Sequence, residues 1–225
     1  MTERRSPQAV WNNLVAGNER FVEGKPEHPN QDVAHRAASS AGQAPTAALF
    51  GCADSRLAAE IIFDNGIGDL FVVRNAGHIV SDSVIASLEY AVAVLGVSVV
   101  VVLAHDSCGA VQAAIDSRQQ HPEPLPPRIT TMLEPIIPAV QSVWLAEHSG
   151  TPYVDPTKIA AEKVNRHHLR DTVSQLLYSS EVLSEAVAEG RLGIVGAHYR
   201  LAKGRVEPVI AIGNFDEDLV EKSEQ

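Results

Sequence analysis

The segment Val97-Ser98-Val99-Val100-Val101-Val102-Leu103, which runs into Ala104-His105-Asp106-Ser107-Cys108-Gly109, decides the fold class of this 225-residue chain. Its first seven residues are mostly β-branched and almost wholly apolar, which is typical of a short parallel strand buried on both faces. A second apolar run, residues 46–50, leads into Gly51-Cys52-Ala53-Asp54-Ser55-Arg56 in the same way. Helical patterns follow both segments, so each motif is predicted to lie where a strand gives way to a helix.

Outward from these two segments, strands and helices alternate along the chain. This alternation predicts an α/β fold with a mostly parallel central sheet of four strands and helices on both faces. The four strands are expected at residues 46–52, 70–74, 97–103 and 192–198. Lys203-Gly204 looks like a two-residue hairpin turn into a fifth strand, residues 206–212, which would lie antiparallel at an edge.

The whole chain, residues 1–225, is expected to form a single domain, with a helical arm at residues 1–24 and an acidic tail at residues 216–225. The arm has an apolar face but connects no two strands. It is therefore expected either to cap the domain or to pack on a partner subunit.

Metal-ligating residue types gather where the two central strands end. The chain has only two cysteines, Cys52 and Cys108, and each lies in one of the two motifs. Thiolate and imidazole are both zinc ligands, and the His105-x-x-Cys108 spacing lets one turn present two of them. Since neighbouring strands lie about 4.8 Å apart, Cys52 can reach the same ion. The less specific interpretation is two buried structural cysteines, and a disulfide lacks any secretory context.

Asp54 leaves two states of such a zinc site open. It could be a fourth ligand that closes the site, or it could pair with Arg56 and leave a place for water. Zinc-bound water ionises to a hydroxide nucleophile, but two thiolates should make the metal a weaker Lewis acid than in a three-histidine site. Activity is therefore expected to be low at about pH 6 to 7 and to rise above about pH 8.

Composition restricts the function classes further. The net charge is −10, the isoelectric point is about 5.3, and no run of Lys or Arg occurs, which argues against nucleic acid as a partner. The first residues lead into no apolar signal region, and no apolar run reaches the roughly 18 residues of a membrane span. The expectation is a cytoplasmic protein with reduced thiols and no membrane partner.

Taken together, Cys52-x-Asp54-Ser55-Arg56 and His105-x-x-Cys108-Gly109 resemble the β-class carbonic anhydrases, and the match looks closest to actinobacterial members. The resemblance covers nearly the whole chain, through Trp11-x-x-Leu14-x-x-Gly17-Asn18-x-Arg20-Phe21, Phe71-Val72-x-Arg74-Asn75-Ala76-Gly77 and Glu89-Tyr90-Ala91-Val92. It implies zinc-dependent, reversible hydration of carbon dioxide to bicarbonate and a proton, with an Asp54–Arg56 dyad controlling access to the fourth zinc position. It also implies a homodimer or a dimer of dimers, with the N-terminal helix reaching across to the neighbour.

The resemblance further implies a substrate pocket, partly supplied by the neighbouring subunit, that contains Gln43, Phe71, Ala76, Tyr90 and Gly109. Without the family, Phe71 and Tyr90 are more often core residues than pocket residues. Ala76 stands where plant-type members often carry valine. A regulatory bicarbonate site in one subgroup uses a tryptophan where this chain has Leu49, so that site is not expected.

Two other functions fit the same motifs. The zinc site could act on carbon disulfide or carbonyl sulfide, since access to the pocket would decide the substrate. The protein could also be a non-catalytic zinc-binding sensor or structural protein with a closed four-ligand site. Arg56 argues against this second function, because a purely structural Asp ligand needs no competing arginine. A thiol redox protein would require Cys-x-x-Cys, which the chain lacks.

Overall fold

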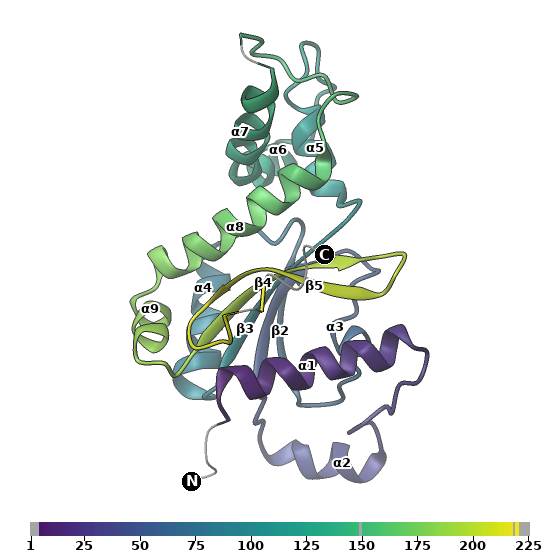
Figure 1. Cartoon of the computed structure of the whole chain (residues 1–225), viewed down its shortest axis with the longest axis vertical. Helices are drawn as coiled ribbons and strands as arrows, with labels where there is room; N and C mark the ends of the chain where they lie inside the picture. The colour runs from purple at the N-terminus through teal and green to yellow at the C-terminus, as the bar shows by residue number, and fades with distance from the viewer. Residues whose placement is uncertain (1–4, 149, 218, 221–225) are drawn as a thin grey trace.

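The centre of the computed structural model, which describes residues 5–148, 150–217 and 219–220, is one five-stranded sheet (Figure 1). Its strands lie in the order β2-β1-β3-β4-β5. β1 to β4 are parallel and β5 is antiparallel to β4, so the predicted fold class is confirmed. The strands are β1 (Ala47–Cys52), β2 (Leu70–Asn75), β3 (Val99–His105), β4 (Gly193–Arg200) and β5 (Arg205–Ile212).

The two central strands owe their composition to burial on both faces. Every residue of β1 and β3 is buried. Leu49 and Val101 belong to the hydrophobic cluster on one side of the sheet, while Phe50 and Val102 belong to the cluster on the other. Phe50 pairs with Val102, so the two strands end side by side and carry both motifs to the same edge of the sheet.

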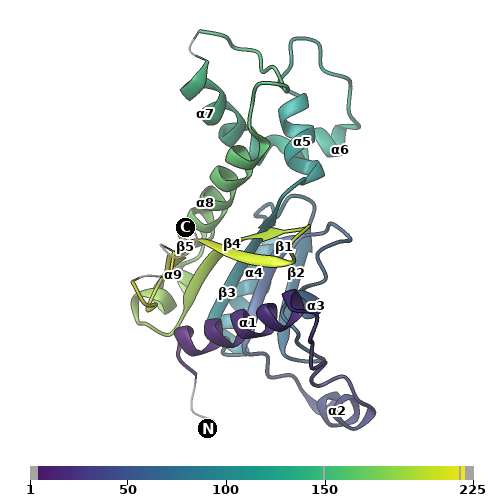
Figure 2. The same ribbon diagram turned by 45° about the vertical axis from the view of Figure 1, so that its right-hand side comes forward.

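Helices cover both faces of this sheet (Figures 1 and 2). One face carries α1 and α3, while α4, the second half of α8, and α9 pack on the other. The α-helices are α1 (Pro7–Val22), α2 (Val33–Ala38), α3 (Ala59–Ile62), α4 (Asp82–Glu89), α5 (Gly109–Asp116), α6 (Pro127–Leu133), α7 (Ile137–Glu147), α8 (Ala161–Ser179) and α9 (Glu181–Ala188). The 3₁₀ turns are η1 (Ser39–Ala41) and η3 (Glu134–Ile136), and η2 (Tyr90–Val94) is a π-helical turn.

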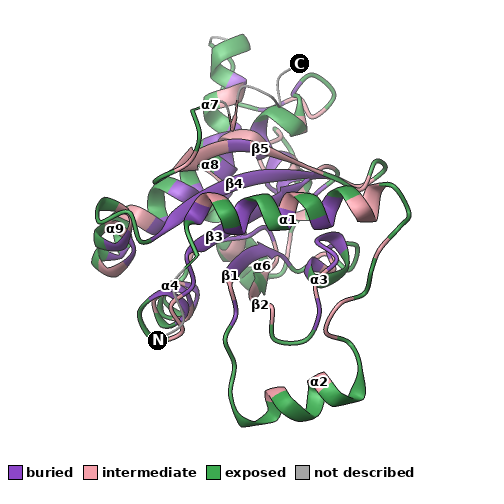
Figure 3. Ribbon diagram, turned by 60° about the horizontal axis from the view of Figure 1, so that its bottom comes forward, coloured by how far each residue is buried: buried purple, intermediate pink, exposed green. Residues whose placement is uncertain are grey.

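The N-terminal helix α1 packs on its own chain, across the sheet (Figure 3). Trp11 and Leu14 are buried in the core, and the Asn18 side-chain amide donates to the carbonyls of Ile62 (3.0 Å) and Gly204 (2.8 Å). Arg20 pairs with Asp64 at 2.6 Å. Of the two predicted roles, α1 therefore caps the domain. Whether α1 also reaches across to a neighbour stays a prediction, which would have to use residues outside this buried face.

One further difference from the sequence prediction concerns a connection. The β4–β5 hairpin turns through four residues, 201–204, rather than two, and Gly204 closes it with φ +67° and a 2.8 Å hydrogen bond to the Arg200 carbonyl. Residues 218 and 221–225 of the predicted acidic tail lie outside the described part of the chain, as do residues 1–4 of the arm.

The helices α5 to α7 and the start of α8 extend beyond the sheet (Figure 1). The segment Pro127–Glu147, 21 residues with mean hydropathy 1.2, is long and apolar enough to cross a membrane by length and composition. By this criterion the expectation that no apolar run is long enough is wrong, because a mean over the segment tolerates the few charged residues that interrupt it. One such helix is weak evidence for a membrane, since helices of soluble proteins pass the same test.

Candidate metal centre

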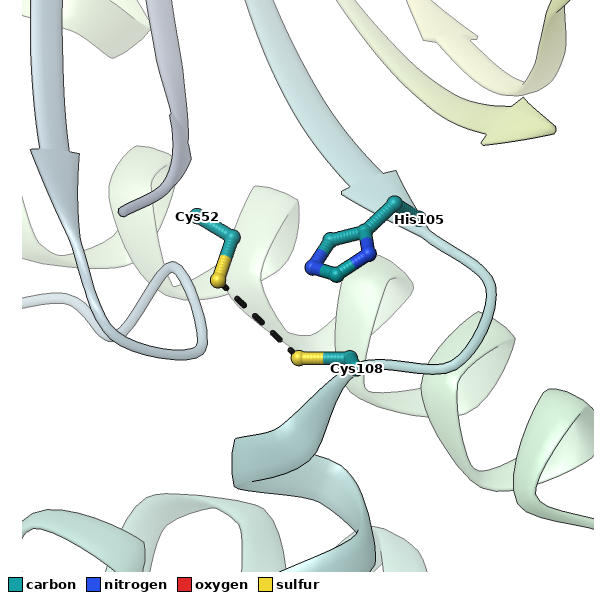
Figure 4. A group of neighbouring side chains, drawn as sticks. All are labelled: Cys52, His105 and Cys108. Carbon is teal, nitrogen blue, oxygen red and sulfur yellow. Dashed lines mark hydrogen bonds between the residues drawn. The ribbon is translucent and has the colours of Figure 1, made fainter. Parts of the chain in front are cut away.

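Three buried side chains meet where the central strands end (Figure 4). Cys52 is the last residue of β1, His105 is the last residue of β3, and Cys108 immediately precedes α5. Their ligand atoms all lie within 4.8 Å of one another, and the two Sγ atoms are 4.0 Å apart. Both cysteines are free thiols. The structure therefore brings together the three predicted ligands, from two strand ends and one turn.

The histidine of this cluster is prepared to bind a metal ion. Its Nδ1 donates to the Asp106 carbonyl at 2.8 Å, which leaves Nε2 without a proton. That Nε2 is buried, faces the two sulfurs, and has no hydrogen-bond partner in the described residues (Figure 4). A buried polar atom without a partner is costly. The donor set of two thiols and one bare imidazole nitrogen fits a soft or borderline divalent metal.

The two thiols differ in acidity because they share a hydrogen bond. This bond with Cys108 is the main reason that the pKa of Cys52 falls to about 4, with help from His105 and from the Gly77 N–H, which lies 3.4 Å from the Cys52 sulfur. The same bond and burial raise the pKa of Cys108. The first thiolate therefore forms readily and the second does not. Metal binding must displace the remaining proton, so affinity should fall as the pH falls.

Asp54 is held by Arg56 in a bidentate ion pair. Arg56 Nε donates to Asp54 Oδ1 at 2.9 Å, and an Arg56 terminal nitrogen donates to Oδ2 at 2.7 Å. These hydrogen bonds keep the pKa of Asp54 well below its usual range. Its Oδ2 lies 3.9 Å from His105 Nε2, and Arg56 also donates to the Ser107 carbonyl at 3.2 Å. The carboxylate thus lies beside the ligand cluster as an ionised acceptor.

Sequence reasoning missed the roles of two residues that hold the ligand segments. Arg74 donates to the carbonyls of Cys52 (2.9 Å) and Asp54 (2.6 Å) from the neighbouring strand β2. Asn165, on α8, donates to the His105 carbonyl at 2.5 Å. Arg74 could have been found from the sheet register, because it lies opposite Gly51, but Asn165 carries no signal in the sequence.

The five predicted substrate-pocket residues are more scattered. Gln43 is exposed in the loop before β1, and Ala76 lies in the turn after β2. The rings of Phe71 and Tyr90 have centroids 6.2 Å apart, on edge strand β2 and on η2. Gly109, Cys108 and Asn165 line a cavity of about 560 Å³, and none of the other four predicted residues lines that cavity. The shared role of the five residues therefore stays a prediction.

Comparison with known proteins gives this site its context. Residues 47–206 match the family model described as carbonic anhydrase. The chain is 47% identical over 214 residues to carbonic anhydrase 2 of Mycobacterium tuberculosis, covering 95% of this chain and 98% of that protein. It is 42% identical over 212 residues to the carbonic anhydrase of Mycolicibacterium smegmatis, with 94% and 98% covered.

Solved structures agree at the level of the fold. A structure described under tetrameric β-carbonic anhydrases of Sordaria macrospora superimposes with a TM-score of 0.67 at 23% identity, over 92% of this chain and 100% of that one. The Coccomyxa β-carbonic anhydrase in complex with acetazolamide gives 0.68 at 23% identity, over 91% and 89%. The chain belongs to the β-carbonic anhydrase family and is a carbonic anhydrase, which confirms the resemblance drawn from the two motifs.

Proposed function

We propose that this protein hydrates carbon dioxide reversibly to bicarbonate and a proton, using zinc held by Cys52, His105 and Cys108. The observation that carries the proposal is the cluster of three ligand atoms within 4.8 Å of one another, next to a carboxylate paired with arginine. When bound, zinc would supply a Lewis acid that lowers the pKa of water and so makes water a nucleophile.

The chain's own residues set the orientation at this site. Because Arg56 holds Asp54 ionised, the carboxylate can only accept hydrogen bonds. It can therefore take the hydrogen of the attacking oxygen and direct a lone pair of that oxygen at the carbon of the substrate. Arg56 also competes with the metal for Asp54, and so controls access to the fourth coordination position. Arg74 keeps both Cys52 and Asp54 in place through their carbonyls.

We also propose that the active form is a homodimer or a dimer of dimers, whose pocket residues come partly from a second subunit. Two exposed hydrophobic side chains of η2 support this proposal: Tyr90, whose ring centroid lies 6.2 Å from that of Phe71 on edge strand β2, is 46% exposed, and Val94 is 64% exposed. The tetrameric description of the Sordaria proteins points the same way. A cytoplasmic location is proposed with it, since the two neighbouring free thiols must stay reduced to bind metal.

Stopped-flow carbon dioxide hydration, combined with metal analysis of the purified protein, tests this function. We expect about one zinc per chain, loss of activity with a chelator, and recovery with added zinc. Carbon disulfide and carbonyl sulfide are assayed on the same samples. Full hydration activity in metal-free protein contradicts the zinc site. A zinc-loaded protein that turns over only the sulfur compounds contradicts the substrate.

A further inference from the structure

Gly77 brings a backbone donor to one of the proposed zinc ligands. It lies in the turn after β2 with φ +76°, a left-handed conformation that favours glycine. A Cβ at this position would lie 2.9 Å from the Cβ of Ala110 and 3.2 Å from Ile136, so a side chain does not fit. The Gly77 N–H donates to Cys52 Sγ at 3.4 Å. The left-handed conformation of Gly77 therefore lets its N–H point at the Cys52 sulfur.

His168, on α8, holds the carbonyl of the same glycine. Its Nε2 lies 2.9 Å from the Gly77 oxygen, although the two residues are 91 positions apart in the sequence. A carbonyl only accepts, so Nε2 must carry the proton and donate. The side chain is 3% exposed, and its Nδ1 has no hydrogen-bond partner in the described part of the chain. Burial lowers the pKa of His168, so the ring is neutral and this tautomer is fixed.

The ring of His78 packs against the ring of His168. The two ring centroids are 4.6 Å apart, with the planes tilted by 41°. His78 is fully buried, and burial is the main cause that lowers its pKa, with His168 adding to the effect. Both rings are therefore uncharged near neutral pH. Any influence on the metal site must pass through shape and hydrogen bonds rather than through charge.

The same face of α8 reaches both ligand-bearing segments. Asn165 and His168 are three residues apart, so their side chains lie on one side of the helix. Asn165 donates to the His105 carbonyl, at the end of β3, and His168 donates to Gly77, which contacts Cys52 at the end of β1. The neighbouring His167 lies on another side of α8, where it is partly exposed and forms hydrogen bonds with Ser142 and Asp171.

We propose that His168 is a positioning residue of the zinc site: its hydrogen bond to the Gly77 carbonyl keeps the Gly77 N–H on Cys52 Sγ, holds that sulfur where the other two ligand atoms meet it, and so strengthens zinc binding. This inference rests on the zinc site proposed above. Removing an outer-sphere partner of a metal ligand typically costs 10- to 100-fold in metal affinity. Because His168 acts through one intervening residue, we expect the low end of that range, a loss of about tenfold.

Two substitutions separate the hydrogen bond from packing against His78. His168→Phe keeps an aromatic ring and removes the donor, whereas His168→Gln keeps a donor near the Nε2 position and removes the ring. Zinc affinity is measured by competition with a chromogenic chelator. The thiolate-to-metal absorption of the cobalt(II)-loaded protein gives a second readout. We expect about a tenfold weaker affinity and a shifted band for His168→Phe, and affinity within about threefold of wild type for His168→Gln.

The matched controls are His167→Phe and His167→Gln, because His167 is the neighbouring residue on α8 but is partly exposed and contacts neither ligand segment through a hydrogen bond. Both controls should keep wild-type zinc affinity. Wild-type affinity in His168→Phe, or a larger loss in His168→Gln than in His168→Phe, would overturn the proposal, because packing would then matter rather than the donor. If His168→Phe does not fold, His168→Gln decides alone: affinity within about threefold supports the proposal, and a tenfold loss overturns it. A wild-type protein that takes up no zinc refutes the zinc site itself, which is a different failure.

Discussion

The metal cluster and the predicted substrate pocket differ in how complete they are within one chain. Cys52, His105 and Cys108 are buried and lie within 4.8 Å of one another. Phe71 lies on edge strand β2, Tyr90 lies next to it and stays 46% exposed, and Gln43 is exposed in the loop before β1. The first group is assembled by the parallel register of β1 and β3, which belongs to the core of the monomer. The second group depends on what covers the edge of the sheet.

This difference separates two kinds of substitution. A change in the metal cluster should act on the isolated chain and reduce metal content and activity together. A change at the β2 edge should leave the metal in place and act on assembly and on substrate. Metal content, activity and oligomeric state therefore need to be measured on the same samples.

The largest effect is expected for Cys108→Ser, which removes one of the two thiolates. The oxygen of serine is a poor zinc ligand, and the remaining Cys52 and His105 offer only two good donors. We expect most of the zinc to be lost and hydration activity to fall at least about 100-fold, beyond the effect of an outer-sphere change. Metal analysis and stopped-flow assays check this result. Full zinc retention with activity would contradict the ligand assignment.

Arg56→Ala should separate metal binding from activity. It removes the bidentate partner of Asp54, so the carboxylate is free to occupy the metal. We expect unchanged zinc content and activity lower by about 100-fold or more, the size of effect seen when a positioned polar group is lost from an active site. Arg56→Lys is the matched control: it keeps the charge but not the two-pronged geometry, so it should recover only part of the activity.

The pH profile of the same samples tests whether Asp54 controls the fourth position. Wild-type activity is expected to be low at about pH 6 to 7 and to rise above about pH 8. A flat wild-type profile, or an Arg56→Ala enzyme that keeps its activity, would contradict this control.

The sequence was sufficient where structure depends on local pattern. The β-branched run in β3 predicted burial on both faces, and the two ligand motifs predicted their own meeting point. It failed where one polar group reaches a distant backbone atom. Arg74 and His168 donate to backbone carbonyls 22 and 91 residues away. Every residue has such a carbonyl, so the sequence does not reveal which one a distant donor will reach. The apolar face of α1 was visible, but periodicity does not say which surface covers it.

A charge on the apolar edge should break assembly while sparing the metal. Val94, at the end of η2, is 64% exposed and follows Tyr90 by four residues, and the Tyr90 ring centroid lies 6.2 Å from that of Phe71 on edge strand β2. Val94→Asp should shift the protein to monomer in light scattering, keep about one zinc per chain, and lower activity by about tenfold, because a desolvated unpaired charge in an interface costs several kcal/mol. The control is Tyr178→Asp on α8, whose side chain is 95% exposed. Unchanged mass and activity in Val94→Asp would contradict a subunit interface at this edge.

Deleting residues 1–24 is a poorer test of assembly. It would expose core residues that Trp11 and Leu14 now cover, and it would remove the hydrogen bonds of Asn18. Loss of activity after that deletion would follow from unfolding of the monomer alone.

The smallest effect concerns the free energy of unfolding in acid. It should depend on the buried histidines near the metal cluster and not on Phe71 or Val94, which carry no ionisable group. His198, on β4, is fully buried, and both of its ring nitrogens lack a partner in the described residues. Burial, followed by the charge of Arg200, lowers its pKa from 6.5 to about 4, against the opposite influence of Glu162 and Asp106. Between these pH values the unfolded chain binds a proton that the folded chain does not. The stability that this group contributes is therefore complete above pH 6.5 and is lost as the pH falls towards 4, by about 3 kcal/mol in all.

In metal-free protein, His198→Leu should remove this contribution to the pH dependence of the free energy of unfolding, whatever it does to stability at neutral pH. Urea unfolding at about pH 7 and about pH 4.5 measures the difference. Equal slopes in wild type and His198→Leu would show that His198 is not held neutral by the fold.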